Sequence, residues 1–498
     1  MIYILFLSLI RHGWLTTILP DPGQAVQAQA VQTKAGQQIQ DPVTAFPNSP
    51  KAPPPRVIDI SVPAAPITPG SAAGQGLPAN VPLTAQEAIK IALHQQPNLG
   101  VQVGAIQVQQ GLTRQAGALE HPMVNLGAGY DQIQSLSGPG SGISTAVQAP
   151  NVVLPPGVSG VNPMSVGADV KQLLFDFNMT RNLVRQSESL ELSAKHSLTI
   201  AQQNLALGVK VAFYNFESGV RSVGVNEANV VNRQRQLDLA NARLTNGVGE
   251  PSDVATAQTS KSQGILQLNQ ARDTVEQDRV ILLQQMGVDP LTPIVATNES
   301  APDEGDNDAQ ALTAKGIKLR PEVKASVEAL AGAKYGLSAA RAVGMPAIYA
   351  EIGAGFNGSS IPLSDNSVNA SIGFQFPIFD GGNRAGAVRA ANGQITVATA
   401  NLKAAVLQVR TDVAGAYMGL KSAIQRVAIA ENEVFNARED VRIAEGRYAA
   451  GIGLFQDITT AQALLLSSLT DQESAKNYLD LSRTQLRKAT GELLADLK

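Results

Sequence analysis

Two stretches of this 498-residue chain carry the same distinctive residues at one constant spacing. They are RLTNGVGEPSDVATAQ, residues 243–258, and RYAAGIGLFQDITTAQ, residues 447–462. Every shared position recurs at one interval, since 447 − 243 and 457 − 253 both equal 204. A constant interval without gaps indicates a duplicated structural unit. The shared pairs are Arg243 and Arg447, Gly247 and Gly451, Gly249 and Gly453, and Asp253 and Asp457, followed by a common Ala-Gln.

Asp253 and Asp457 are the ionisable groups in these stretches whose position suggests a role. Each follows a turn that contains two glycines and comes at the start of a new helical pattern. Aspartate is favoured there because its carboxylate accepts hydrogen bonds from unpaired backbone amides and interacts favourably with the helix dipole. Position alone therefore predicts that both residues cap the helices that follow them.

The rest of the composition excludes several kinds of site. The chain has no cysteine, its four histidines (His12, His94, His121 and His196) are scattered, and no nucleophile is paired with a base. Charged residues make up 16% and the net charge is −3, so no basic face for nucleic acid is indicated. We therefore predict no catalytic site, no cofactor, no metal site and no nucleic-acid partner. No apolar run is long enough for a membrane-spanning helix.

The N-terminal 80 residues differ in composition from the rest. The apolar run MIYILFLSLI and the small residues AQA at 28–30 predict a signal peptide over residues 1–30. A disordered cytosolic tail is the alternative. Residues 31–80 are rich in Pro, Ala, Gln and Gly, which predicts a disordered linker because such a composition cannot form a core.

The elements that must position the two turns are long helices. No proline interrupts residues 180–244, where apolar residues recur every three or four positions, and residues 384–448 form a counterpart of equal length. At 1.5 Å per residue each helix would be roughly 100 Å long. Shorter helices are predicted over 252–286 and 456–491, with near-heptad patterns typical of coiled coils.

Each half also begins with shorter helical patterns. In the first half, Thr84 and Glu87 form a capping-box pattern that opens a helix, and the helical pattern continues to about Leu119. In the second half, the corresponding segment is LRPEVKASVEALAGAKYGLSAARAVGMP. The sequence thus divides into a first unit over 81–300, a second unit over 312–491 and a C-terminal tail over 492–498.

Four segments alternate between apolar and polar or glycine residues with a period of two. They are residues 122–132 and 164–176 in the first unit and 346–358 and 367–378 in the second. Their length is that of a tilted strand crossing a bilayer, and aromatic residues lie in or beside them. Four strands cannot close a barrel, and an open edge cannot exist in lipid, so strands must be pooled between chains. We predict a mixed, mainly α fold in which duplicated helix-strand-strand-helix units form a trimeric, 12-stranded β-barrel continued by an α-helical coiled-coil barrel.

The order helix, strand, strand, long helix, turn, helix, given twice, resembles the TolC-like outer-membrane efflux protein family. The paired turns are the most specific feature. A second one is FQFPIFDGGNRAGAV (374–388), similar to the family's strand-to-helix junction, where Pro377, Phe379, Asp380, Gly381 and Gly382 lie. The resemblance implies a homotrimeric channel-tunnel in the outer membrane of a Gram-negative-type bacterium, extending into the periplasm. It also implies a periplasmic adaptor and an inner-membrane pump as partners, in tripartite efflux or type I secretion.

The same resemblance gives the two turns a role. They match the periplasmic tips of the family's helical tube, where Arg243, Gly247, Gly249, Arg447, Gly451 and Gly453 would meet the adaptor. Asp253, Asp457 and Tyr448 match gate positions, and a ring of carboxylates from three chains would favour cations. Capping and gating both remain open for the aspartates. The position at which a relative can carry a gate-locking arginine is Gly453 here, and a possible second acidic position is Thr460.

Two functions follow from these observations. A passive exit duct would be trimeric and conducting, and would depend on a pump and an adaptor. A structural or adhesive envelope protein could use the same coiled coils without conducting. The duplicated strands and the paired turns favour the duct.

Overall fold

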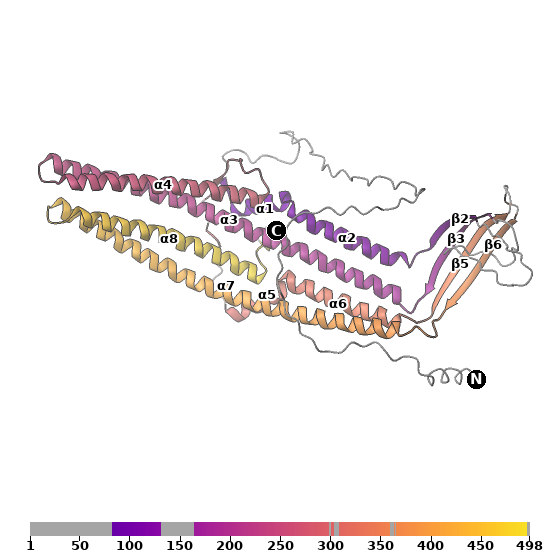
Figure 1. Cartoon of the computed structure of the whole chain (residues 1–498). Coiled ribbons are helices and arrows are strands. Elements are labelled where there is room, and N and C mark those ends of the chain that lie inside the picture. The colour runs from indigo at the N-terminus through magenta and orange to yellow at the C-terminus, as the bar shows by residue number, and fades with distance from the viewer. Residues whose placement is uncertain are drawn as a thin grey trace, which may run out of the picture. The chain divides into compact units, whose positions relative to one another are not determined.

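The computed structural model describes residues 82–130, 164–297, 300–302, 308–358, 363 and 365–495. The chain divides into residues 1–69 and a second unit, residues 70–498, that contains every described element. The predicted signal peptide (1–30) and linker (31–80) lie outside the described residues. Within the second unit, long helices lead away from a small sheet, which lies at one end of them (Figure 1).

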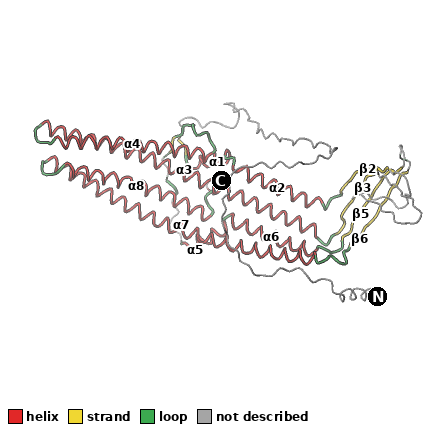
Figure 2. Tube along the Cα trace, viewed as in Figure 1, coloured by secondary structure: helices red, strands yellow, loops and turns green. Residues whose placement is uncertain are grey.

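Two helical hairpins form most of the described structure. The first joins α3 (Met179–Thr245) to α4 (Pro251–Met286), and the second joins α7 (Asn383–Ala449) to α8 (Phe455–Thr490). The long helices have 67 residues each and the return helices 36 each. At 1.5 Å per residue, a long helix measures about 100 Å. Both return helices end at a glycine in the left-handed conformation, which terminates a helix without a Cβ clash. The two hairpins also pack against each other through α3 and α8 (Figure 2).

Four shorter helices brace the long ones near their sheet-proximal halves. They are α1 (Ala85–Gln95), α2 (Asn98–Ala118), α5 (Ala309–Leu319) and α6 (Pro321–Ala342). The capping box predicted for the first of them is present, with Thr84 Oγ1 accepting from the Glu87 amide at 3.2 Å. The single helical pattern expected up to Leu119 was wrong in one respect. It is broken at Gln96, whose extended backbone follows from its place before Pro97.

The strands form one antiparallel sheet in the order β2-β3-β5-β6. These strands are β2 (Met123–Tyr130), β3 (Met164–Phe175), β5 (Ala347–Gly358) and β6 (Asp365–Gln375), and they occupy the four alternating segments. The last strand ends earlier than the predicted residue 378, and Pro377, which cannot donate to a ladder, lies just beyond it. A separate two-residue parallel pair, β1 (Pro82–Leu83) with β4 (Val295–Ala296), had no sequence signal.

One face of the sheet is apolar across all four strands. In one row across the sheet, Val124 of β2 pairs with Val170 of β3. Val170 pairs with Ile352 of β5, and Ile352 pairs with Ala370 of β6. The adjacent row, on the opposite face, runs from Asn125 through Asp169, and these two side chains are hydrogen-bonded at 2.9 Å. The alternation in the sequence therefore sorts side chains by polarity onto two faces. The large apolar side chains that are exposed on these strands include Val124, Leu126, Val166, Val170, Ile352, Phe356, Val368 and Ile372.

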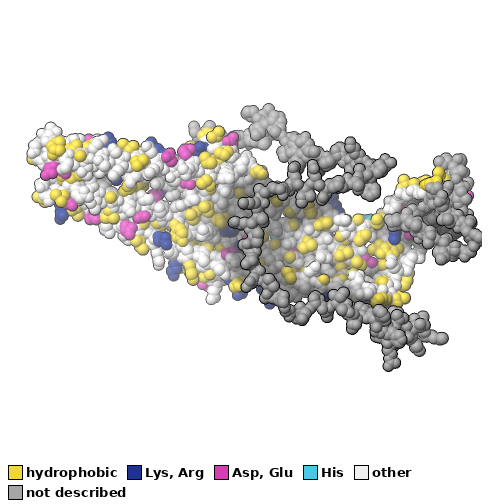
Figure 3. Space-filling view, viewed as in Figure 1, with side chains coloured by type: hydrophobic (Ala, Val, Ile, Leu, Met, Phe, Trp, Pro, Cys, Tyr) yellow, Lys and Arg dark blue, Asp and Glu magenta, His cyan; other side chains and the backbone are white. Residues whose placement is uncertain are grey.

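The interior of the helical part is divided into separate clusters. The largest packs α1 against the middle of α3 and the end of α4, around Phe213 and Leu282. Another lies near the turns and contains five alanines among its eleven buried residues, with Tyr448 and Phe455 as its aromatic members. Small residues let the helices approach closely, as coiled-coil packing requires. Figure 3 shows hydrophobic and charged side chains interspersed along the visible face of the hairpins. Within the described residues, every helix is too short or too polar to cross a bilayer.

Candidate functional site at the hairpin tips

The two turns, here called the first tip (residues 243–257) and the second tip (residues 447–461), have the same backbone design. In the first tip, the Arg243 carbonyl accepts hydrogen bonds from the Val248 and Gly249 amides, both at 3.0 Å. In the second, the Arg447 carbonyl accepts the two corresponding bonds at 3.0 and 3.1 Å. These bonds satisfy carbonyls that a helix end would leave unpaired. Both tips lie at the end of the hairpins away from the sheet (Figure 1).

Two glycines in each tip are required by this geometry, for different reasons. Gly247 and Gly451 have φ angles of +73° and +78°, a region in which other residues are strained. Gly249 and Gly453 instead lie against the preceding helix, where a Cβ would come within 2.6 and 2.8 Å of the closest atom. The recurrence of glycine at these four positions therefore has a steric cause in the tips themselves.

A hydrogen bond links the two hairpins at the tips. Tyr448, at the end of α7, donates from its hydroxyl to Oδ2 of Asp253, in the first turn of α4, at 2.9 Å. The tyrosine is only 2% exposed and packs edge-to-face on Phe455, with 5.5 Å between ring centroids. Burial and the neighbouring Asp253 carboxylate raise the pKa of Tyr448 to about 12. The hydroxyl therefore stays protonated, and can donate, at any physiological pH.

Arg243 makes a second link between the hairpins, at the same tyrosine. Its guanidinium carbon lies 4.5 Å from the Tyr448 ring centroid, a cation–π contact. Its Nη1 donates to the Tyr448 carbonyl at 2.6 Å, and its Nη2 donates to the Val248 carbonyl of its own tip at 3.3 Å. Arg447, its counterpart in the second tip, is exposed. The two arginines thus have different surroundings, although they occupy equivalent positions in the sequence repeat.

The two aspartates also differ. The Oδ2 of Asp457 accepts from the amide of Leu454 at 3.3 Å, and the side chain is exposed at the start of α8. Asp253 is half-buried and directed to Tyr448 instead. The capping role considered for both residues is thus seen at Asp457. The asymmetry follows from the sequence, because the residue at the Tyr448 position of the first tip is Leu244, which cannot donate a hydrogen bond.

The strand-to-helix junction is a second group of predicted residues, and it lies at the opposite end of α7 from the tips. Asp380 accepts from the Gly382 and Arg384 amides at 2.9 and 2.8 Å, and these bonds lower the pKa of its carboxyl. Gly381 and Gly382 have φ angles of +63° and +91°. Pro377 and Phe379 complete this turn, and Phe379 is exposed. The junction therefore directs the chain from β6 into α7.

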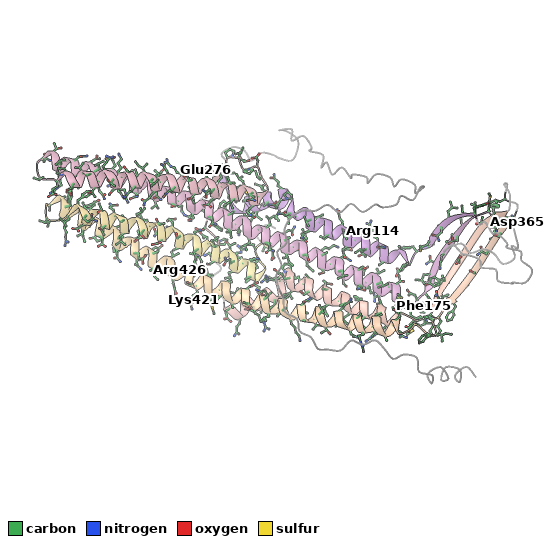
Figure 4. The ribbon with its side chains drawn as sticks, in the orientation of Figure 1. Arg114, Phe175, Glu276, Asp365, Lys421 and Arg426 are labelled. Carbon is green, nitrogen blue, oxygen red and sulfur yellow. The ribbon has the colours of Figure 1, made fainter. Side chains whose placement is uncertain are left out.

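The first half has an equivalent junction that the sequence patterns above did not single out. Asp176 caps α3 by accepting from the Thr180 amide at 2.7 Å, and it precedes Asp380 by the same 204 residues. Phe177 and Asn178 take the left-handed conformation there, with φ angles of +55° and +63°. The sequence signal for this equivalence is weak, because FDFN (175–178) and FDGG (379–382) share only the phenylalanine and the aspartate. In Figure 4, Phe175 marks the point where β3 leads into this junction.

Comparison with known proteins decides the family. The sequence profile described as "Outer membrane efflux protein" matches residues 88–288 and 315–492. These ranges include both tips and the helices α2, α3, α6 and α7, which flank the four strands of the sheet. The chain belongs to the outer membrane efflux protein family. Members of this family are outer-membrane channels that extend into the periplasm and serve efflux, and enzymatic activity is not among their properties.

Individual relatives and solved structures agree with this assignment. The outer membrane efflux protein BepC of Brucella suis is 25% identical over 343 residues, which cover 67% of this chain and 73% of BepC. The CyaE protein of Bordetella pertussis is 27% identical over 416 residues, which cover 82% of each chain. The crystal structure of CusC has a TM-score of 0.70 at 16% identity, covering 82% of this chain and 92% of CusC. The outer membrane protein VceC of Vibrio cholerae has a TM-score of 0.67 at 17% identity, covering 82% and 96%. The structural likeness establishes the fold that these channels share.

Proposed function

We propose that this outer membrane efflux protein is a homotrimeric channel-tunnel that provides the passive exit duct of a tripartite efflux pump or a type I secretion system. Its chain would consist of a signal peptide (1–30), a linker (31–80), two duplicated units (81–300 and 312–491) and a short tail (492–498). The equal lengths of the paired helices and the recurrence of tips and junctions at one interval support the duplication.

The observation that carries the proposal is the apolar face of the sheet together with its two edges. Within the described residues, β2 and β6 each pair with a single neighbour, so each leaves one edge unpaired. Exposed apolar side chains continue across the face, with Leu126 on β2 and Val368 on β6 both more than 80% exposed. Lipid would cover this face, and strands from two further chains would pair the edges, giving twelve strands. The polar face would then line the lumen.

Exposed apolar side chains on the helices support the same assembly. Val101 and Val108 on α2, and Met418 and Phe435 on α7, are all exposed in the single chain. Exposed apolar side chains that follow one another along a helix are typical of a surface that packs against another protein surface. In the proposed trimer, helices of neighbouring chains would cover them and close the tube.

The tips would form the periplasmic gate and the contact with the adaptor. Tyr448, Asp253 and Arg243 hold the two hairpins of one chain together, so separating the hairpins would break these contacts. Asp253 and Asp457 from three chains would place carboxylates around the narrowed end and favour cations. The turn residues Gly247, Gly249, Arg447, Gly451 and Gly453 would present the surface that an adaptor contacts. The most exposed large apolar side chains on it are Val248, Ile452 and Leu454.

Native mass and conductance test this function. The full-length protein, extracted in detergent from the outer-membrane fraction, should have the mass of three chains and form conducting pores in planar bilayers. A monomer would contradict the pooled strands. A trimer that never conducts, even when the hydrogen bond from Tyr448 to Asp253 is removed by Tyr448→Phe, would instead favour the structural or adhesive envelope protein.

A further inference from the structure

A cavity lies between the two hairpins, lined partly by residues of the two tips and partly by the helical turns next to them. It has a volume of about 470 Å³ and is bounded by α3, α4 and α8. The side chains that matter for its chemistry are Arg233 and Gln236 of α3, Thr256 and Thr259 of α4, and Thr459 of α8. This volume is within the range of sites that hold small molecules.

Arg233 is the charged group of the cavity, and the part of the chain that the structure describes gives it no acidic partner. It is 9% exposed, its Nε donates to Asn229 Oδ1 at 3.1 Å, and its Nη1 donates to the Ser260 carbonyl at 2.7 Å. No ion pair involves it among the described residues, in contrast to Arg320, which is also buried, at 5% exposed, but faces two carboxylates. Burial without a compensating carboxylate lowers the pKa of Arg233. A guanidinium has five N–H groups, so this one keeps donors for a further acceptor.

Gln236 carries a second unused donor on the same wall, a buried Nε2 that must turn toward the cavity to reach a ligand. The side chain is 4% exposed, and its Nε2 has no hydrogen-bond partner in the described structure. A buried amide group without a partner destabilises the folded chain, so an acceptor that reaches it is favoured. The rest of the lining consists of alanines and neutral hydroxyl and amide side chains, and no carboxylate is among them. The cavity therefore offers hydrogen-bond donors and one positive charge, and no side chain of its lining carries a negative charge.

The duplication does not explain this cavity. Adding 204 to Arg233 and Gln236 leads to Ala437 and Asp440, so the second hairpin has neither the guanidinium nor the amide. The first hairpin also makes room for the arginine. A Cβ at Gly264 would lie 2.8 Å from Cδ of Arg233, whereas the corresponding residue of the second hairpin is Ser468. Arg233 and Gly264 are thus a matched pair found in one hairpin alone.

We propose that this cavity binds the carboxylate group of a small molecule, with the Arg233 guanidinium and the Gln236 amide as donors to its two oxygens. The fork of an arginine matches the two oxygens of a carboxylate, and a charge-assisted hydrogen bond is about twice as strong as a neutral one. The threonine hydroxyls around the cavity would contact the rest of the molecule. The site adjoins the tips, to which Thr256 and Thr459 belong, but its charge has the opposite sign to that of the tip carboxylates. Its ligand binding does not depend on the proposed duct.

Calorimetric titration of the full-length protein in detergent tests the proposal, with succinate as the probe and succinamide as an uncharged ligand of the same shape. Succinate should bind with one saturable site per chain, and succinamide should bind at least about tenfold more weakly. The variant Arg233→Met should lose at least about tenfold in affinity, and Gln236→Leu about three- to tenfold. The control Arg442→Met, at an exposed arginine paired with Glu439, should bind like the wild type.

Three results would overturn the site. They are the absence of saturable succinate binding up to roughly 50 mM, equal binding of succinate by Arg233→Met, and equal binding of succinamide by the wild type. Tighter binding of inorganic phosphate than of succinate would also contradict the assignment to carboxylates. If Arg233→Met does not assemble, Arg233→Lys replaces it. This variant keeps the charge but loses the fork, so its affinity for succinate should still fall.

Discussion

The Tyr448 hydroxyl donates to the Asp253 carboxylate at 2.9 Å and so joins residues that are 195 positions apart in the chain. The bond runs from the last turn of α7 to the first turn of α4, which belong to different hairpins. It is buried at the tyrosine and is reinforced by Arg243, which stacks on the same ring. Any outward movement of one hairpin relative to the other must first break this group of contacts.

Tyr448→Phe should therefore loosen the tips. It removes the hydroxyl and leaves the half-buried Asp253 without that donor, at a cost of about 1–3 kcal/mol. Since each 1.4 kcal/mol changes an equilibrium about tenfold, we expect clearly higher single-channel conductance or open probability in planar bilayers. The matched control is Tyr478→Phe, which keeps the ring that stacks on Arg426. Equal conductance of wild type and Tyr448→Phe would contradict a closing role for the bond.

The aspartates should be separable by substitution with asparagine. Both Asp253→Asn and Asp457→Asn remove negative charge from the tips, so both should reduce cation preference, measured as the reversal potential in a salt gradient. Asp253→Asn alone should also raise conductance, because it weakens the acceptor of the Tyr448 hydroxyl. Unchanged ion selectivity in both variants would eliminate the carboxylate ring.

Alkaline titration provides a test of the buried tyrosine. Its pKa of about 12 in the folded chain is above the value of about 10 of an unfolded tyrosine. The folded state thus holds this proton more tightly, and the associated stability is complete below about pH 10 and is lost as the pH rises through 12. Ultraviolet absorbance should show a late-ionising tyrosine in the wild type that is missing in Tyr448→Phe. A titration of the same late amplitude in both proteins would refute the assignment.

The sequence alone was sufficient to locate the long helices, the four strands of the sheet and the two tips, because their signals are local. Period-two alternation located the strands, and proline-free helical patterns located α3 and α7 within a residue or two. Glycines at one interval located the tips, since their φ angles and close approaches leave little choice of residue. The break before Pro97 could also have been predicted from the proline, whose preceding residue avoids the helical region.

Contacts between hairpins could not be predicted in this way. The pattern that repeats at 204 residues treats Arg243 like Arg447 and Asp253 like Asp457, but the neighbours of each depend on the other hairpin. One difference decides which aspartate bonds to the other hairpin. The second tip has Tyr448, which donates to Asp253, where the first tip has Leu244, which has no donor for Asp457. The Arg233 cavity has no repeat partner at all, so a search for recurring residues passes over it.

The two strand-to-helix junctions allow a reciprocal test of backbone strain. Asn178 and Gly382 are 204 residues apart and both are left-handed, with φ angles of +63° and +91°. Gly382→Ala should destabilise the protein by about 1 kcal/mol, since a Cβ is disfavoured in this region, whereas Asn178→Gly should be neutral or stabilising by a few tenths. Urea unfolding in detergent would measure both effects, with Gly386→Ala as a control inside α7, where a helical alanine should stabilise by about 0.5–1 kcal/mol. A Gly382→Ala variant as stable as Gly386→Ala would show that the junction is free to adopt another backbone conformation.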